Sequence, residues 1–228
     1  METASRSCSL LCQSDCTNNR AGAPVRVDLQ KANQSTIGGD VTEFELRDLW
    51  QRTCFEGCLS PEIRIEIEAA IKWLRDEGEP RVAFWRGRFV YEYFGELGLR
   101  NTSISDFTEA LWIDPTDLDS RYLLACSLFD SLRYKEAATQ FREVISDSRL
   151  YGPDTLWRAL KAKELLAVSL LETGHCGEKA AVLSWYPNYA KAKEEDRPVP
   201  LELRRALKKR GCDLSSEFPL LYEGLSAI

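Results

Sequence analysis

Apolar residues recur at helical spacing along most of the chain after residue 80. In "ISDFTEALWIDPTDLDSRYLLA" (residues 104–125) one such stripe is interrupted at Pro115 and a second stripe follows it. Residues three or four positions apart share one face of a helix. No segment beyond residue 80 alternates apolar and polar residues over the length of a strand. The pattern therefore predicts an all-α protein.

The N-terminal part of the chain divides into two segments. Residues 1–40 are rich in Ser, Asn, Gln, Thr and Gly without periodicity, which predicts a disordered tail. Helical patterning begins near Val41, and Ser60 followed by Pro61 is a helix start signal. We therefore expect N-terminal capping helices within residues 41–80. The main breaks expected after residue 80 are Pro115, Leu132-Arg133, Gly152-Pro153, Gly174 and Pro187.

A motif of small, aromatic and small-to-medium apolar residues occurs twice, 34 residues apart. Its two copies are Ser103, Phe107 and Ala110, then Ala137, Phe141 and Val144. A small residue lets a paired helix approach closely, and the aromatic ring fills the groove beside it. Self-similarity at this period predicts an array of helix hairpins.

These residues resemble the tetratricopeptide repeat (TPR) family. The clearest unit is "LDSRYLLACSLFDSLRYKEAATQFREVI", in which Leu124-Ala125 stands for the family's Leu-Gly pair, and Ala137 and Phe141 form its second-helix signature. "SISDFTEALWIDP" matches the end of the preceding unit, and "LKAKELLAVSLLETGHCGEKAAVLSWYP" is a degenerate third unit displaced by "SDSRLYGPDT". The resemblance covers residues 81–187 and implies an α-solenoid of about three TPR-like hairpins with flanking capping helices. Residues 188–228 would supply a C-terminal helix, "PLELRRALKKRG", and a tail.

The resemblance also implies a function. In the TPR family the first helices of the hairpins line a concave groove that binds a peptide or helix segment of another protein, so we expect a scaffold or adaptor for protein–protein interaction. The charged residues on the predicted first helices are the candidate partner-binding residues: Arg86, Arg88, Glu92, Arg121, Arg158 and Lys161. The alternative is a structural subunit of a larger assembly or homo-oligomer that joins through apolar edges. "SSEFPLLYEGLSAI" (residues 215–228) is either such an edge or a segment that packs onto the last helix.

Composition narrows the partners. The net charge of −6 and a pI of about 5.1 give no general reason to bind nucleic acid or anionic membranes. No apolar run approaches the roughly 18 residues of a membrane span, and the N-terminus lacks the apolar stretch of a signal peptide. We therefore expect a cytoplasmic protein, with the nucleus as the alternative, and cysteines that remain thiols.

Candidate chemistry is sparse. His175 is the only histidine and lies in a Gly-bounded turn, so we expect no enzyme activity, no cofactor and no metal site. Cysteines recur every four residues at Cys8, Cys12 and Cys16 and again at Cys54 and Cys58. Metal binding or redox sensing is open there, although ordinary thiols are favoured. Cys126 is expected in the core.

Three further groups of residues carry expectations. Asp106 and Glu109 are expected to face water beside Phe107. The aromatic residues expected to serve in packing are Trp73, Trp85, Tyr91, Trp112, Tyr122 and Trp157. The one basic cluster comprises Arg204, Arg205, Lys208, Lys209 and Arg210. Cations at a helix C-terminus offset the macrodipole, which is the favoured interpretation, and binding of an acidic partner is the alternative. Nucleic acid is not favoured without interleaved aromatic residues.

Overall fold

The described part of the chain is a stack of α-helices. The computed structural model describes Asp48 and residues 81–93 and 100–222. Within these ranges the prediction of an all-α protein is confirmed, because seven α-helices and no strand occur there. The α-helices are α5 (Val82–Tyr93), α6 (Arg100–Ile113), α7 (Leu118–Asp130), α8 (Tyr134–Ser146), α9 (Leu156–Glu172), α10 (Glu178–Lys191) and α11 (Leu201–Lys209). Three short 3-10 helices lie between or after them: η2 (Ser148–Tyr151), η3 (Glu194–Asp196) and η4 (Pro219–Leu221).

Several expectations fall on residues outside the described ranges. These are the disordered tail over residues 1–40, the capping helices within residues 41–80 apart from the helical Asp48, the five N-terminal cysteines and Trp73.

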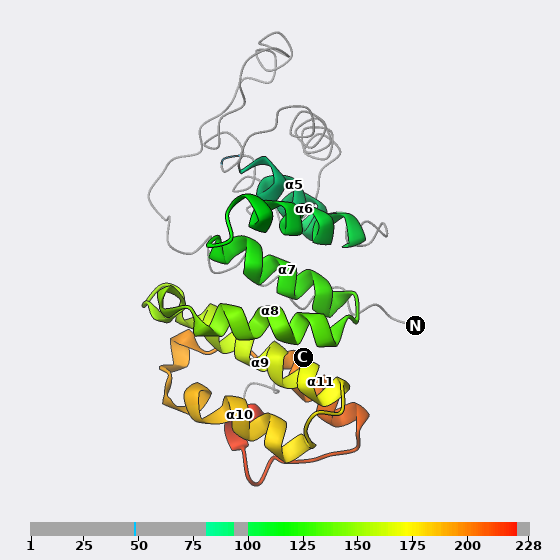
Figure 1. Cartoon of the computed structure of the whole chain (residues 1–228). Helices are drawn as coiled ribbons and strands as arrows, with labels where there is room; N and C mark the ends of the chain where they lie inside the picture. The colour runs from blue at the N-terminus through cyan, green and yellow to red at the C-terminus, as the bar shows by residue number, and fades with distance from the viewer. Residues whose placement is uncertain (1–47, 49–80, 94–99, 223–228) are drawn as a thin grey trace, which may run out of the picture.

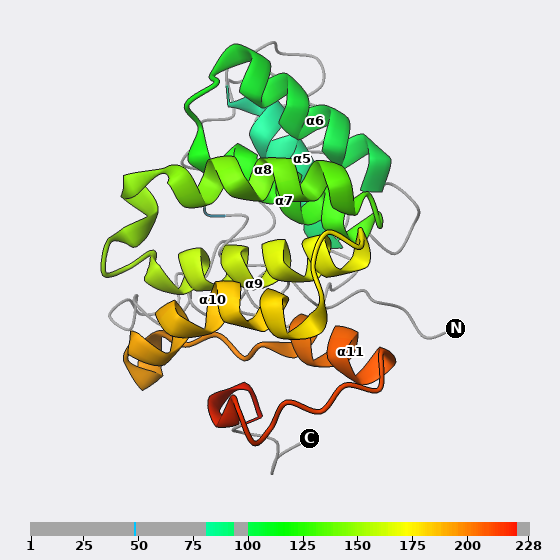
Figure 2. The same cartoon turned by 60° about the horizontal axis from the view of Figure 1, so that its bottom comes forward.

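The helices follow one another through space in chain order. Figure 1 shows α5 and α6 at one end of the stack, α7 and α8 in the middle, and α9, α10 and α11 at the other end. Figure 2 shows α9 between α8 and the layer formed by α10 and α11, and α9 contacts all three. We call α5, α7 and α9 the first helices and α6, α8 and α10 the second helices. Each first helix also contacts the next first helix.

Gly87 on α5 lies in close contact with α6. A Cβ atom at Gly87 would lie 2.9 Å from Cε1 of Phe107 and 3.1 Å from Cβ of Asp106, so a side chain has no free space there. Phe107 is fully buried beside it. Ser103, the small residue of the motif, is also buried, and its hydroxyl donates to that of Ser127 on α7. Small residues therefore set the spacing of α6 to both neighbouring helices.

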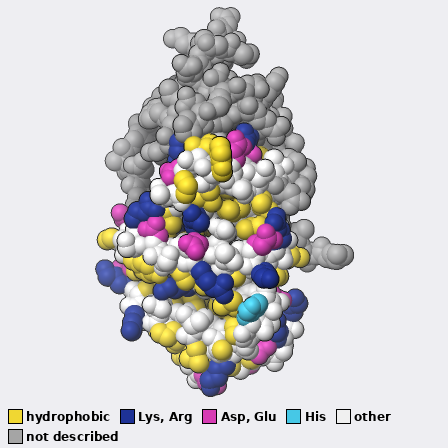
Figure 3. All heavy atoms as spheres, in the orientation of Figure 1, with side chains coloured by type: hydrophobic (Ala, Val, Ile, Leu, Met, Phe, Trp, Pro, Cys, Tyr) yellow, Lys and Arg dark blue, Asp and Glu magenta, His cyan; other side chains and the backbone are white. Residues whose placement is uncertain are grey.

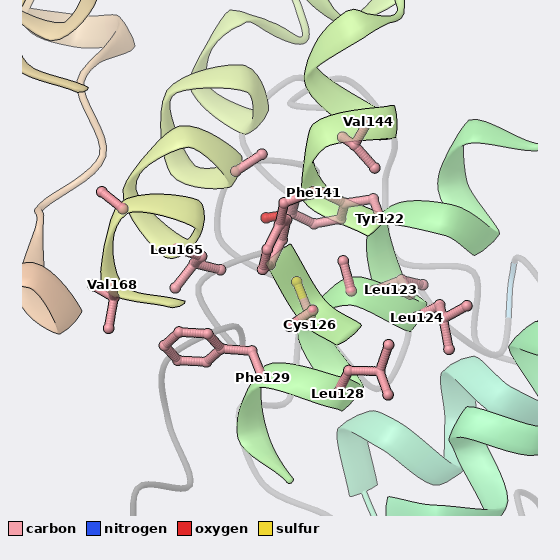
Figure 4. Packing of buried hydrophobic residues seen from close by; sticks show 14 of the residues in the cluster. Tyr122, Leu123, Leu124, Cys126, Leu128, Phe129, Phe141, Val144, Leu165 and Val168 are labelled. Carbon is pink, nitrogen blue, oxygen red and sulfur yellow. The ribbon is translucent and has the colours of Figure 1, made fainter. Parts of the chain in front are cut away.

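The middle of the stack contains the largest continuous part of the core. Residues 122–129 of α7 are all buried. Figure 4 shows Phe129 of α7 beside Leu165 of α9, with Phe141 of α8 nearby, and the two phenylalanine rings are 6.5 Å apart. Cys126 lies in this core, as predicted. The second copy of the motif thus holds α7, α8 and α9 together through contacts that no single hairpin provides.

The helices α7, α9 and α11 end in the same way. In each, a residue with positive φ follows the last turn: Leu132 at 60°, Gly174 at 72° and Gly211 at 66°. The next N–H then bonds to the carbonyl five residues earlier, from Arg133 to Leu128, from His175 to Leu170 and from Cys212 to Leu207. This is the Schellman motif. The predicted C-terminal helix is confirmed, and it ends and packs on α9 like a further first helix.

Pro187 does not end the third hairpin, which corrects the expected break. It lies inside α10, which continues to Lys191. Its side chain is exposed, where the ring meets no packed neighbour, and it lies only one turn from the helix end, where few hydrogen bonds follow it. Arg197 satisfies the carbonyls beyond it, donating to Tyr189, Ala190 and Ala192.

The C-terminal apolar segment packs inward in its described part. Leu214, Phe218 and Leu221 are buried, and the ring of Phe218 lies 4.9 Å from that of Tyr186 on α10. Of the two alternatives for "SSEFPLLYEGLSAI", packing onto the helices holds for residues 215–222, and residues 223–228 lie outside the described ranges.

The contact at Gly87 predicts a specific loss of stability. Alanine gains about 1 kcal/mol of helix propensity over glycine. Displacing the Phe107 ring costs about 1–3 kcal/mol. We therefore expect Gly87→Ala to lower the free energy of unfolding by about 1 kcal/mol in denaturant titrations. Gly177→Ala is the control, because its Cβ would meet nothing within 4 Å. Equal or greater stability of Gly87→Ala than of the wild type would contradict the close approach of α5 and α6.

Candidate interaction surface

Arg86 joins the two helices of the first pair. Its Nε donates to Asp106 Oδ1 and its Nη2 to Glu109 Oε2, both over 2.7 Å and both on α6. Only 13% of its side chain is exposed. The predicted partner-binding residue is therefore already engaged in a fork of two carboxylates, which restrains its position.

Asp106 does not face water, which corrects the expectation for it. It is buried against Arg86, whereas Glu109 remains exposed on the outer face of α6. Burial alone would lower the pKa of Arg86, but the hydrogen bonds and charges of Asp106 and Glu109 outweigh it and raise that pKa. A buried carboxylate needs such a partner, because an unpaired charge is costly to remove from water.

Arg88 and Arg158 lie over aromatic rings of the first helices. The guanidinium carbon of Arg88 is 5.6 Å from the ring centre of Trp85. That of Arg158 is 5.5 Å from the ring of Tyr122, and its Nη1 donates to Asp119 over 2.5 Å. Stacking on a ring and pairing with a carboxylate both fix the plane of a guanidinium. Arg158 thus lies where α7 and α9 meet, and Arg88 lies over a ring of its own helix α5.

Arg121 and Glu92 are placed differently. Arg121 donates to the carbonyl of Pro115 in the turn before α7 and to Gln140 on α8, so it leans towards the second helices. Glu92 lies in the last turn of α5, and its side chain is outside the described part. Arg86, Arg121 and Arg158 therefore contact different helices, namely α6, α8 and α7.

Lys161 is part of a buried polar junction between α9 and α11. Its Nζ lies 2.8 Å from Glu164 Oε2, and both side chains are buried. The other oxygen, Oε1, accepts the backbone N–H groups of Glu202 and Leu203 over 3.0 and 3.1 Å. Glu164 thus satisfies the first N–H groups of α11 from a neighbouring helix, which α11 cannot satisfy itself.

Polar contacts between residues far apart in the chain join α5 to α7, α7 to α9 and α9 to α11, counting the residue just before each helix. We call the following set the first-helix ladder: Arg81 with Asp117, Tyr91 with Asp130, Asp119 with Arg158, and Glu164 with the N-terminus of α11. The partners are 36 to 39 residues apart in the chain. The ladder therefore repeats about once per helix pair and aligns each first helix on the next.

The ladder does not appear when like residues are compared at a fixed lag. Three of its contacts pair an arginine or a tyrosine with a carboxylate, the fourth pairs a carboxylate with backbone N–H groups, and their separation exceeds the lag of the apolar motif by a few residues. A search for opposite charges one helix pair apart would have found Arg81 with Asp117 and Asp119 with Arg158.

Exposed apolar residues form a second kind of candidate surface. The Trp112 residue is 84% exposed on α6, next to Ile113, so the expectation that it serves in packing is wrong. Trp85, Tyr91 and Tyr122 are buried, as expected. Figure 3 shows hydrophobic side chains over α6, with both signs of charge interspersed over the helices below it. Trp112 lies near the end of α6 and meets no later helix that would cover it.

The described residues hold little that resembles a catalytic centre. They contain no group of three or more His, Cys, Asp or Glu residues that could hold a metal ion. His175 lies exposed in its turn, with Nδ1 2.9 Å from the Thr173 hydroxyl. Burial raises the pKa of the neighbouring Cys176 thiol, which lowers its thiolate fraction. Among these residues no helix has the length and apolar character to cross a membrane.

Comparison of the chain with protein-family models, with curated proteins and with solved structures gives no match.

The junction at Glu164 predicts a local loss of stability. In Glu164→Gln the side chain keeps only one acceptor oxygen. If that oxygen accepts the two α11 N–H groups, the amide NH2 group faces the Lys161 ammonium, donor against donor. Removing one member of a buried ion pair costs about 3 kcal/mol. We expect this loss in denaturant titrations, with faster hydrogen exchange at residues 201–209.

Glu217→Gln is the matched control, because its ion pair with Lys179 is largely exposed. We expect it to change stability by less than about 0.5 kcal/mol. Similar effects of the two substitutions would contradict the role of Glu164 in holding α11.

Proposed function

We propose that this protein is a protein–protein interaction module, a scaffold or adaptor that binds a peptide or helix segment of a partner along its first helices in a TPR-like superhelix. The observation that carries the proposal is the pair of Arg88 and Arg158, each lying over aromatic rings and each on a first helix. Arginine and aromatic side chains are the residue types that dominate binding energy at protein interfaces.

The ladder supports this proposal through preorganisation. Arg158 is held by Asp119 and by the ring of Tyr122, so little side-chain entropy remains to be lost when a partner binds. Asp119 is partly exposed beside it and offers a carboxylate to the same partner. A peptide with a carbonyl or carboxylate for Arg158 and a donor for Asp119 fits this arrangement. We propose Arg88 and Arg158 as the principal contacts, with Arg86 and Arg121 holding the helices that present them.

The alternative is a structural subunit, and Trp112 is the observation that favours it. A Trp side chain exposed to 84% is of the type and exposure that anchors a subunit contact. In the homo-oligomeric form of this alternative a second copy of the chain covers Trp112, and a single monomeric mass of the purified chain by light scattering contradicts that form. In a larger assembly a different protein covers Trp112.

The proposal is tested by comparing the full-length wild type with Arg88→Ala/Arg158→Ala in affinity capture with quantitative mass spectrometry. Partners that depend on the first helices are expected to fall by about tenfold in the double variant, since truncating one interface arginine commonly costs at least 1 kcal/mol. Circular dichroism melting checks that the variant remains folded.

Lys135→Ala/Arg142→Ala is the control, because both residues are exposed on the outward side of α8 and the charge change is the same. Partners retained by the control and lost from the Arg88/Arg158 variant support the first-helix surface. Partners captured equally by all three proteins contradict it.

A further inference from the structure

The helix α11 carries three cations on the side away from the core. Leu203, Ala206 and Leu207 are buried, and α11 packs on α9. The exposed cations Arg205, Lys208 and Lys209 are spaced three and four residues apart and so share the opposite face. The side chains of Arg205 and Lys209 are 57% and 74% exposed. We call these three residues the basic face of α11.

The other two cations of the basic cluster have structural roles. Arg204 donates to the carbonyl of Leu221 and so holds the C-terminal segment. Arg210 donates to the carbonyl of Leu171 over 2.8 Å and lies 3.4 Å from Glu178. Both side chains tie α11 to neighbouring parts of the stack. The basic cluster read from the sequence therefore divides into two fastening residues and three outward ones.

The three outward cations have weak contacts within the described residues. Arg205 pairs with Glu202 one turn earlier on its own helix, and Lys209 lies 3.6 Å from Glu172. Lys208 makes no ion pair in the part of the chain that is described. Exposed pairs of this kind contribute little to stability. The fold therefore does not explain why three cations share this face, where like charges at such spacing repel one another.

The helix macrodipole accounts for only part of the basic face. The last carbonyls of α11 are satisfied by the backbone, because Cys212 N–H bonds to Leu207 and Gly211 N–H to Lys208, each over 3.0 Å. Gly211 supplies the positive φ that this ending needs. Lys208 and Lys209 lie in the last turn of α11 and Arg210 follows it, so these cations also offset the macrodipole. Because that effect falls off within the last turn, it does not account for Arg205, which lies one turn earlier on the face that it shares with Lys208 and Lys209.

We propose that the basic face of α11 is a docking surface for an acidic segment of a partner protein. The argument is charge complementarity: Arg205, Lys208 and Lys209 form a positive strip about one helical turn long, on a chain whose net charge is −6. A peptide with two or three carboxylates at neighbouring positions matches this strip. The junction at Glu164 and the contacts of Arg210 hold the strip rigid, so binding does not need to order α11.

Other polyanions fit the strip less well. The strip is only about one helical turn long, so it matches two or three neighbouring carboxylates better than the long, dense charge of nucleic acid. The described aromatic residues with large exposure, Trp112 and Tyr151, lie on α6 and η2 and not on α11, where bases would stack. The exposed side of α11 also lacks a large apolar residue to insert into a bilayer. The basic face shares no residue with the first-helix contacts of the proposed function, so either proposal can fail without the other.

The test titrates full-length protein into a fluorescein-labelled polyglutamate peptide and follows fluorescence anisotropy. The variant is Arg205→Gln/Lys208→Gln/Lys209→Gln, and the matched control is Lys135→Gln/Arg142→Gln/Lys191→Gln, which removes the same charge from exposed sites on α8 and α10. Lys208→Gln is the second variant, because Lys208 makes no described contact whose loss would affect folding. A thymidine oligonucleotide and phosphatidylserine vesicles are the comparison ligands.

We expect the wild type and the control to bind the peptide alike and the triple variant to bind about tenfold more weakly, with Lys208→Gln in between. Wild-type binding should weaken as salt rises, because the contacts are exposed and screened. Equal weakening in the triple variant and the control would overturn the proposal, since net charge alone would then act. Absence of wild-type binding would also overturn it, as would stronger binding of the oligonucleotide or vesicles that is lost in the same variant.

Discussion

Residues 122–129 of α7 are buried without interruption, and a helix buried around its circumference needs neighbours on more than one side. Its partner α8 covers one side, and α6 and α9 pack beside it. The contact of Phe129 with Phe141 and the close approach at Gly87 are local expressions of this constraint. Because each pair depends on its neighbours, stability is distributed along the stack and weakens towards its ends.

The first-helix ladder fixes the register of the packed helices. Apolar contacts tolerate sliding, whereas a hydrogen bond between Arg158 and Asp119 or between Glu164 and the α11 backbone fixes one register. The same contacts pair most of the charged groups that a groove would otherwise present to a partner. In the proposed function, Arg86 and Lys161 therefore hold the frame, and the partner meets the arginines that remain over aromatic rings.

Sequence patterns predicted the structure correctly where a single residue type determines a helix end or the burial of its own side chain. The apolar lag located the α6–α8 region, Gly174 ended α9, and Cys126 was placed in the core. The sequence was less informative where the packing of neighbouring helices determines a backbone conformation or whether a side chain is exposed. Leu132 takes a left-handed conformation that its residue type disfavours, because the packed helices α7 and α8 impose the turn. Pro187 is tolerated because it lies on an exposed side near a helix end, and Trp112 is exposed because no later helix covers the end of α6.

For the candidate site, too, residue positions could be predicted from the sequence and their contacts could not. Charged residues on the first helices could be named from spacing, but the carboxylate partners of Arg86 and Arg158 lie 20 to 39 residues away and depend on how neighbouring helices align. Asp106 illustrates the difference. Its position beside Phe107 suggested an exposed carboxylate, but the ion pair with Arg86 of the paired helix compensates its charge and allows it to be buried. The basic cluster near the C-terminus looked uniform in sequence and divides only when α11 is placed on α9.

The most direct test of this account is native-state hydrogen exchange on the full-length chain, measured against denaturant. If α7, α8 and α9 are joined by shared packing, their most protected amides, including residues 122–129 and 165–171, will exchange with one common free energy and denaturant dependence. The helix α11 will open at lower free energy, as expected for the end of an array. Separate opening of α9 while α7 stays protected would contradict the shared core and the ladder that aligns it.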